Sequence, residues 1–167
     1  MHPAALADEE LWRECRMGKS RSGGPGGQHR NKVETMVTIT HEPTGISAHA
    51  DEHRSAIENK QLAFKRLRLA LAIQVRRPVP IGDARSKLWI TRTPGGKIVC
   101  SPNHRDYAAL LAEALDMIAA SRFDPRKSAV RLDVTSSQLI RFVAGHPAAL
   151  VWWNAHRETL GLHALSR

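Results

Sequence analysis

A glycine-rich stretch that runs into a basic segment is the part of this sequence best suited to chemistry. It reads Ser22-Gly23-Gly24-Pro25-Gly26-Gly27-Gln28-His29-Arg30-Asn31-Lys32. Glycines this dense adopt backbone conformations that other residues avoid, and they leave their N–H groups bare. The backbone can therefore approach a ligand closely, and Arg21, Arg30 and Lys32 indicate that this ligand is anionic. We expect a binding or catalytic loop here rather than a packing element.

Length and charge limit the functions open to the chain. Its 167 residues suit one domain with an appendage, or two very small domains. The formal net charge is +9, from 25 Lys and Arg against 16 Asp and Glu, which favours nucleic acid or another acidic partner. The alternative is a merely soluble basic protein. The first 18 residues are net acidic, and the basic part begins where the glycine-rich stretch begins.

Several other classes of protein are disfavoured. Cys15 and Cys100 lie far apart, which fits a reducing cytoplasm better than a disulfide scaffold, so we expect a cytoplasmic protein. The N-terminus has no apolar signal core, and no apolar run is long enough to span a membrane. His49 and His53 straddle a strand end and a helix start, and Gly96-Lys97 lacks the spacing of a phosphate-binding loop. We expect no metal and no cofactor.

The first half of the chain predicts a small sheet with one long helix. A short amphipathic helix is expected over residues 5–16, with Asp8 as its N-cap, and an extended piece over residues 16–21. Strict alternation predicts a strand over residues 33–41, a turn over residues 42–45, and a returning strand over residues 46–50. A basic helix should follow over residues 54–75. Its sheet-facing side is expected to carry Ile57, Phe64, Leu67, Ala70 and Leu71.

The second half reads as mostly helical. Three turn-forming residues within residues 76–83 place a boundary there, giving domains 1–77 and 78–167. Residues 86–101 suit either a hairpin or a helical turn capped by Ser86. Helices are expected over residues 106–121, 125–132, 136–144 and 147–160, with Trp152 and Trp153 buried among them. The fold class is therefore α+β: a small mixed or antiparallel sheet with a long packed helix, then a mostly α-helical C-terminal extension.

The order of several motifs resembles a known family. The glycine-rich string is followed by Asn31-Lys32-Val33, a strand, Pro43-Thr44-Gly45-Ile46, and then Arg54-Ser55 with Asn59 at the head of the basic helix. This series resembles the catalytic domain of class I peptide chain release factors over about residues 14–75. In detail it is most similar to the short, codon-independent and release-factor-like members. Gly-Gly-Gln alone is a weak signal, whereas the ordered series is specific.

The resemblance implies hydrolysis, within the ribosome, of the ester that joins a peptide to its tRNA. It implies catalytic roles for Gly26, Gly27 and Gln28, with large-subunit rRNA and peptidyl-tRNA as partners of a monomeric protein. His29 is expected to be an RNA-contacting loop residue rather than a general base. The implied contacts to RNA phosphates come from Arg21, Arg30, Lys32, Arg54, Lys60, Lys65, Arg66 and Arg68.

Two departures from the family's patterns bear on how a ribosome would be chosen. Fewer than about twenty-five residues precede the loop, so we expect no codon-recognition domain and no reading of stop codons. Rescue hydrolases of the family end in a flexible basic tail, whereas the last twenty residues here read as a packed helix end. The expectation is codon-independent rescue of stalled ribosomes, by a sensing mechanism that the sequence does not reveal.

Two other functions stay open. One is a ribosome-binding or RNA-binding factor that keeps the fold without releasing peptide. The other is a DNA-binding regulator that uses residues 125–144 as a helix-turn-helix, although this segment offers few base-reading side chains. Those side chains are Ser137, Gln138 and Arg141.

Overall fold

The chain divides into two compact units in the computed structural model, which describes residues 1–21 and 34–167. One unit is Leu6–Leu71, and the other combines Met1–Ala5 with Ala72–Arg167. The first holds a three-stranded antiparallel sheet and the second is helical, so the α+β prediction is confirmed. The predicted domain boundary between residues 77 and 78 stays a prediction.

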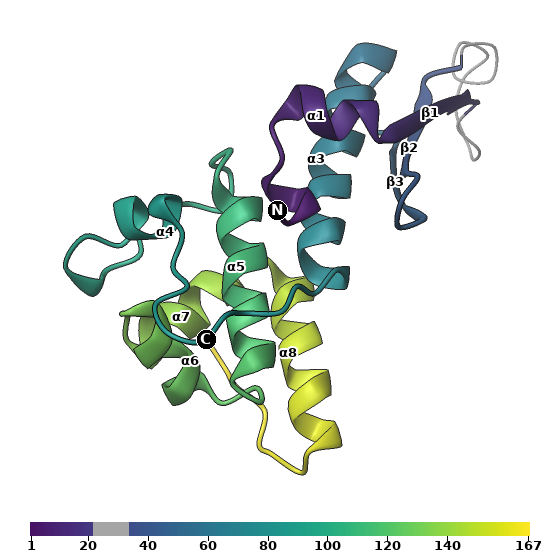
Figure 1. Ribbon diagram of the computed structural model, residues 1–167. Coiled ribbons are helices and arrows are strands. Elements are labelled where there is room, and N and C mark those ends of the chain that lie inside the picture. Colours follow the sequence, from purple (N-terminus) through teal and green to yellow (C-terminus); the bar gives the residue numbers. More distant parts are fainter. Residues whose placement is uncertain (22–33) are drawn as a thin grey trace. The chain divides into compact units, whose positions relative to one another are not determined.

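The sheet is formed by β1 (Cys15–Ser20), β2 (Met36–His41) and β3 (Ile46–Ala50), in that order (Figure 1). Residues along the central strand β2 alternate between buried and half-buried, as its period of two predicts. The extended piece expected before the loop is β1, an edge strand that is exposed from Arg16 onwards. The turn after β2 closes with Gly45 in the left-handed region (φ 72°), where a side chain is disfavoured.

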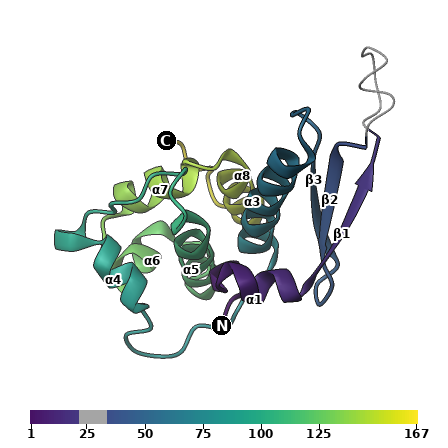
Figure 2. The same cartoon turned by 90° about the horizontal axis from the view of Figure 1, so that it is seen from above.

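One face of the sheet is covered by α3 (Ala56–Gln74) (Figure 2). The residues of α3 that are fully buried at this face recur four apart, as Asn59, Ala63, Leu67 and Leu71. The expected packing role of Ile57 is wrong, because its side chain is 70% exposed. Ile57 precedes Asn59 by two positions, roughly 200° around a helix, so burying Asn59 turns Ile57 outward.

Asn59 ties the start of β2 to the start of α3. Its Nδ2 donates to the carbonyl oxygens of Thr35 (2.7 Å) and His53 (2.9 Å), and its Oδ1 accepts from the His53 N–H (2.9 Å). The Asn59 side chain is fully buried. One carboxamide therefore satisfies three backbone groups from two segments that are separated in sequence.

The helix α1 (Asp8–Arg13) is shorter than expected and packs on α3. The rings of Trp12 and Phe64 stack with their centres 4.3 Å apart, so Phe64 faces α1. The expected N-cap, Asp8, is wrong by one residue: Ala7 is the N-cap, and its N–H donates to the Glu10 carboxylate (3.3 Å). Asp8 is instead free to pair with Arg68.

The helical unit has α5 (Tyr107–Ala120) at its core. The other helices of this unit, in order, are η1 (Pro3–Ala5), α4 (Lys87–Arg92), η2 (Pro94–Gly96), α6 (Pro125–Leu132), α7 (Ser136–Ala144) and α8 (Pro147–Thr159). The four helices predicted from residue 106 onwards are confirmed to within one residue at each end. Of the two tryptophans expected to be buried, Trp153 is fully buried and Trp152 is half-buried.

The hairpin alternative for residues 86–101 is wrong, and the helical turn is right. The Ser86 hydroxyl accepts from the Trp89 N–H (3.0 Å) and caps α4. Trp89 is fully buried, and its Nε1 donates to the Leu132 carbonyl (2.9 Å). Burying the indole with its N–H satisfied favours the helix over a strand.

Replacing Asn59 by alanine should destabilise the protein by about 2–4 kcal/mol, even though alanine is the better helix former, because three backbone groups lose their buried partner. The measurement is urea unfolding. Gln61→Ala, at an exposed position of the same helix, is the control and should change stability by less than about 0.5 kcal/mol. Equal midpoints for the two variants would contradict the role given to Asn59.

Acid should weaken the helical unit through His2. Its Nδ1 accepts from the Ala4 N–H (3.0 Å), its Nε2 lies 3.0 Å from the Val75 carbonyl, and burial lowers its pKa from 6.5 to about 4. Between these two pH values the unfolded chain binds a proton that the folded chain does not, so the free energy of unfolding falls as pH falls. Because His2 is partly exposed, we expect the free energy of unfolding to fall by about 1 kcal/mol over this pH range. Unfolding at a series of pH values should show a smaller acid loss for His2→Asn, and an unchanged loss would refute this.

Candidate functional site

The residues predicted to act on substrate lie on the connection between β1 and β2. Gly26, Gly27, Gln28, Arg30 and Lys32 fall outside the described residues, so their predicted roles stay predictions. The strands on either side are described: β1 ends at Ser20, β2 begins at Met36, and these two residues are paired. The last residue of β1 and the first residue of β2 therefore lie next to each other at one end of the sheet (Figure 1).

The downstream end of this connection is held by the Asn59 contact. Thr35, whose carbonyl accepts from Asn59, directly precedes β2. Asn59 was predicted only as a matching position of the motif, and its anchoring role was missed. The available signal was a polar residue in line with Ala63 and Leu67, since an amide buried at such a position requires partners.

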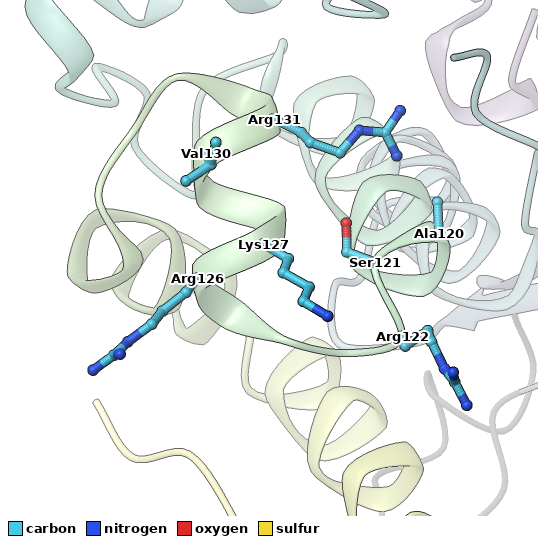
Figure 3. Close-up of a pocket in the computed structure, with 7 residues that line it drawn as sticks. All are labelled: Ala120, Ser121, Arg122, Arg126, Lys127, Val130 and Arg131. Atoms are coloured by element: carbon cyan, nitrogen blue, oxygen red, sulfur yellow. The ribbon is translucent and has the colours of Figure 1, made fainter. Parts of the chain in front are cut away.

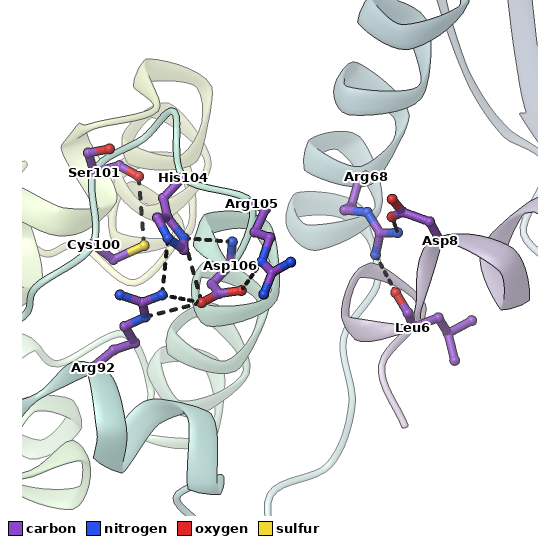
Figure 4. A network of polar contacts seen from close by, with 9 residues as sticks. All are labelled: Leu6, Asp8, Arg68, Arg92, Cys100, Ser101, His104, Arg105 and Asp106. Atoms are coloured by element: carbon purple, nitrogen blue, oxygen red, sulfur yellow. Dashed lines mark hydrogen bonds and ion pairs between the residues drawn. The ribbon is translucent and has the colours of Figure 1, made fainter.

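Two of the α3 cations predicted to bind RNA are engaged within their own unit. Arg68 donates to the Leu6 carbonyl (2.6 Å) and to the Asp8 carboxylate (2.6 Å), and its side chain is only 13% exposed (Figure 4). Arg66 donates to the His49 carbonyl (2.9 Å) and pairs with Glu52. The hydrogen bond from Arg66 lowers the pKa of Glu52 to about 2. Both guanidinium groups thus have a structural role, whatever else they bind.

The remaining cations differ in how freely they are presented. The Lys60 Nζ lies 4.6 Å from the centre of the Trp12 ring, a cation–π contact on an exposed side chain. Arg21 and Arg54 are exposed and make no side-chain hydrogen bond or ion pair with the residues that the structure describes. Lys65 is also exposed. Arg21 and Arg54 are therefore the predicted cations best placed to meet an outside anion.

A second polar cluster, in the helical unit, connects helices rather than forming a reactive centre. Arg92 donates to the Asp106 carboxylate through Nε (3.1 Å) and Nη2 (2.6 Å), and His104 Nε2 lies 3.0 Å from the same Nη2 (Figure 4). Arg92 ends α4 and Asp106 precedes α5, so the cluster fixes this pair of helices. Burial raises the pKa of the nearby Cys100 thiol, which makes it a poor nucleophile.

Other chemistries find little support in the described part of the chain. Residues 1–21 and 34–167 contain no group of three His, Cys, Asp or Glu side chains that would hold a metal ion. Within the same residues, no helix is both long and apolar enough to cross a membrane. Three side chains on α7 were suggested for reading DNA. One of them, Gln138, accepts a hydrogen bond from the Ile98 N–H (3.3 Å) within the protein.

Comparisons with known proteins agree with the motif. The family model described as the RF-1 domain matches residues 12–81. Peptide chain release factor 1 of Chlorobaculum tepidum is 35% identical over 131 residues, covering 71% of this chain and 35% of that protein. Peptide chain release factor 1 of Chloroherpeton thalassium is 49% identical over 65 residues, covering 38% of this chain and 18% of that protein.

A human protein is also similar to this chain. Mitochondrial peptide chain release factor 1 of Homo sapiens is 40% identical over 63 residues, covering 38% of this chain and 14% of that protein. The chain spans about a third or less of the length of the curated relatives it matches. The match includes β2, β3 and α3 and contains the Gly26-Gly27-Gln28 tripeptide. The predicted resemblance is confirmed over this segment: residues 12–81 match the RF-1 domain, and the relatives named above are peptide chain release factors.

Proposed function

We propose that this protein acts in translation as a peptide-releasing factor, hydrolysing the ester of peptidyl-tRNA within the ribosome. The observation that carries the proposal is the intact Gly26-Gly27-Gln28 tripeptide inside the matched segment, on the connection between two paired strands. A loop that only binds RNA has no need of this tripeptide. The proposed partners are large-subunit rRNA and peptidyl-tRNA, and the proposed location is the cytoplasm.

The roles of the three residues follow from the chemistry of ester hydrolysis. Attack by water places negative charge on the carbonyl oxygen, and the Gln28 N–H would donate a hydrogen bond to that oxygen. The side-chain amide of Gln28 is neither acid nor base near neutral pH, so it would position the attacking water rather than take its proton. Gly26 and Gly27 would let the backbone fit where side chains clash with RNA. The protein thus supplies half of a site that RNA completes.

We further propose that release requires no stop codon and serves ribosomes stalled on broken messages. The support is the motif series, which is most similar to the short, codon-independent members of the family. The matched segment ends at residue 81, and the chain that follows forms a helical bundle. A factor that binds the ribosome without releasing peptide is the outcome that would replace this proposal.

Gly27→Ala should reduce peptide release by about 100-fold or more, because the added methyl group obstructs the backbone that presents the oxyanion donor. Gln28→Ala should lose less, because its N–H survives. The measurement is peptide release from ribosomes stalled on a truncated message. Inactive wild-type protein would favour the binding factor, release only with a stop codon would overturn codon independence, and equal losses would refute the ordering of the two variants.

A matched pair of variants should distinguish a cation that binds RNA from one that stabilises the fold. Arg54→Gln removes an exposed charge, so it should weaken ribosome binding, lower the salt slope by about 0.7–0.9, and leave stability within about 0.5 kcal/mol. Arg68→Gln removes the same charge but breaks contacts to Leu6 and Asp8, and should cost about 1–3 kcal/mol of stability. Ribosome pelleting and urea unfolding measure the two effects. Full stability of Arg68→Gln would contradict the assignment.

A further inference from the structure

A basic groove lies in the helical unit where α5 ends and α6 begins. It has a volume of about 550 Å³ and is open to solvent (Figure 3). Its lining includes Ser121 and the exposed apolar side chain of Val130. The four cations of this basic groove are Arg122, Arg126, Lys127 and Arg131.

Local backbone geometry brings these side chains together. Arg122 (φ 54°) and Phe123 (φ 61°) both occupy the left-handed region, which reverses the chain sharply between α5 and α6. Lys127 and Arg131 are four apart on α6 and so share one face of the helix. In Figure 3 both extend towards the side on which Ser121 lies, while Arg126 points away from it.

The charge of the basic groove is not neutralised from within. None of its four cations forms an ion pair with a carboxylate in residues 1–21 or 34–167. Within the described residues, their one side-chain hydrogen bond runs from Arg131 Nη2 to the Pro80 carbonyl (2.9 Å). The carboxylate of Asp124, at the same junction, accepts from the Lys127 N–H (2.9 Å) and so caps α6. A concave surface with this charge attracts anions.

Ser121 is an independent sign of a missing ligand. The residue is 7% exposed, and its buried Oγ has no hydrogen-bond partner in the described chain. Leaving a buried hydroxyl without a partner is unfavourable, so most buried hydroxyls in proteins have one. This hydroxyl lines the basic groove, where a bound anion would supply an acceptor once the long cationic side chains adjust around it.

We propose that the basic groove binds the phosphodiester backbone of RNA, with phosphate oxygens accepting from Arg122, Lys127, Arg131 and the Ser121 hydroxyl. The choice of RNA rests on the proposed function, whereas the anion site itself does not. RNA is favoured over an acidic peptide by the half-buried aromatic cluster that begins at Phe123, the residue that follows Arg122 in the chain. The half-buried Phe123 ring lies 4.6 Å from His156 and 5.6 Å from Trp152, between ring centres. Aromatic rings next to cations suit nucleotide bases.

The test measures binding of the full chain to a fluorescein-labelled single-stranded RNA of mixed sequence over a salt series. The groove variant is Arg122→Gln with Lys127→Gln, two side chains without partners in the described part of the chain. The matched control is Lys87→Gln with Lys97→Gln, which removes two exposed charges of the same unit outside the groove. We expect the groove variant to bind about 25-fold more weakly at 0.1 M salt, with the salt slope reduced by about 1.4, and the control to change by about twofold or less.

Ser121→Ala separates a ligand role from a structural one. It should weaken RNA binding yet leave the thermal midpoint unchanged or higher, since the hydroxyl satisfies nothing in the fold. A lower midpoint with unchanged binding would count against the proposal. Equal RNA affinity of the groove and control variants would overturn the proposal. Polyglutamate that competes as effectively as unlabelled RNA would also overturn it, because it would indicate an acidic peptide as the ligand.

Peptide release by the same variants distinguishes the two proposals. Wild-type protein that releases no peptide, while the groove variant still loses RNA affinity, would sink the proposed function and leave the basic groove standing. If the wild-type protein releases peptide but the groove and control variants bind RNA equally well, the proposed function stands and the RNA-binding role of the basic groove is refuted.

Discussion

The hydrogen bonds of one buried carboxamide hold together the unit that carries the proposed site. Asn59 joins the segment just before β2 to the segment just before α3, and no other buried side chain of α3 in that unit is polar. An apolar residue at this position would leave backbone groups of Thr35 and His53 without partners. The sheet, the helix that covers it and the downstream end of the glycine-rich connection therefore depend on the same amide.

The cations of this protein fall into two physical classes. Arg66, Arg68 and Arg92 act as internal donors whose carbonyl and carboxylate partners fix one element to another. Arg21, Arg54 and the cations of the basic groove have no carboxylate partner in the described chain, so their charge is available to outside anions. Net charge alone combines the two classes. Cations that hold the fold together must therefore be subtracted from the net charge before that charge is used to judge how well the protein binds RNA.

Most of the architecture was predictable because its signals are local. The starts of α6 and α7 follow from the capping side chains of Asp124 and Thr135, and β2 follows from its alternation. The prediction was wrong, or left two alternatives open, where distant contacts decide the outcome. The outward position of Ile57 depends on the partners of Asn59, and α4 depends on a bond from Trp89 to Leu132. The basic groove escaped prediction because left-handed backbone at Arg122 and Phe123 leaves no sequence signature.

The exposed edge of strand β1 bears on the tendency of the protein to aggregate. It pairs with β2 along one edge, and among the described strands none lies along the other, so its free N–H and carbonyl groups form a template on which a foreign strand can dock. Arg16 and Lys19 are exposed on this short strand and place positive charge near that template, although Arg16 also lies 4.0 Å from the Glu42 carboxylate. A second copy of the same strand would bring like charges into contact, which disfavours edge-to-edge stacking of identical chains while leaving the edge accessible to anionic surfaces.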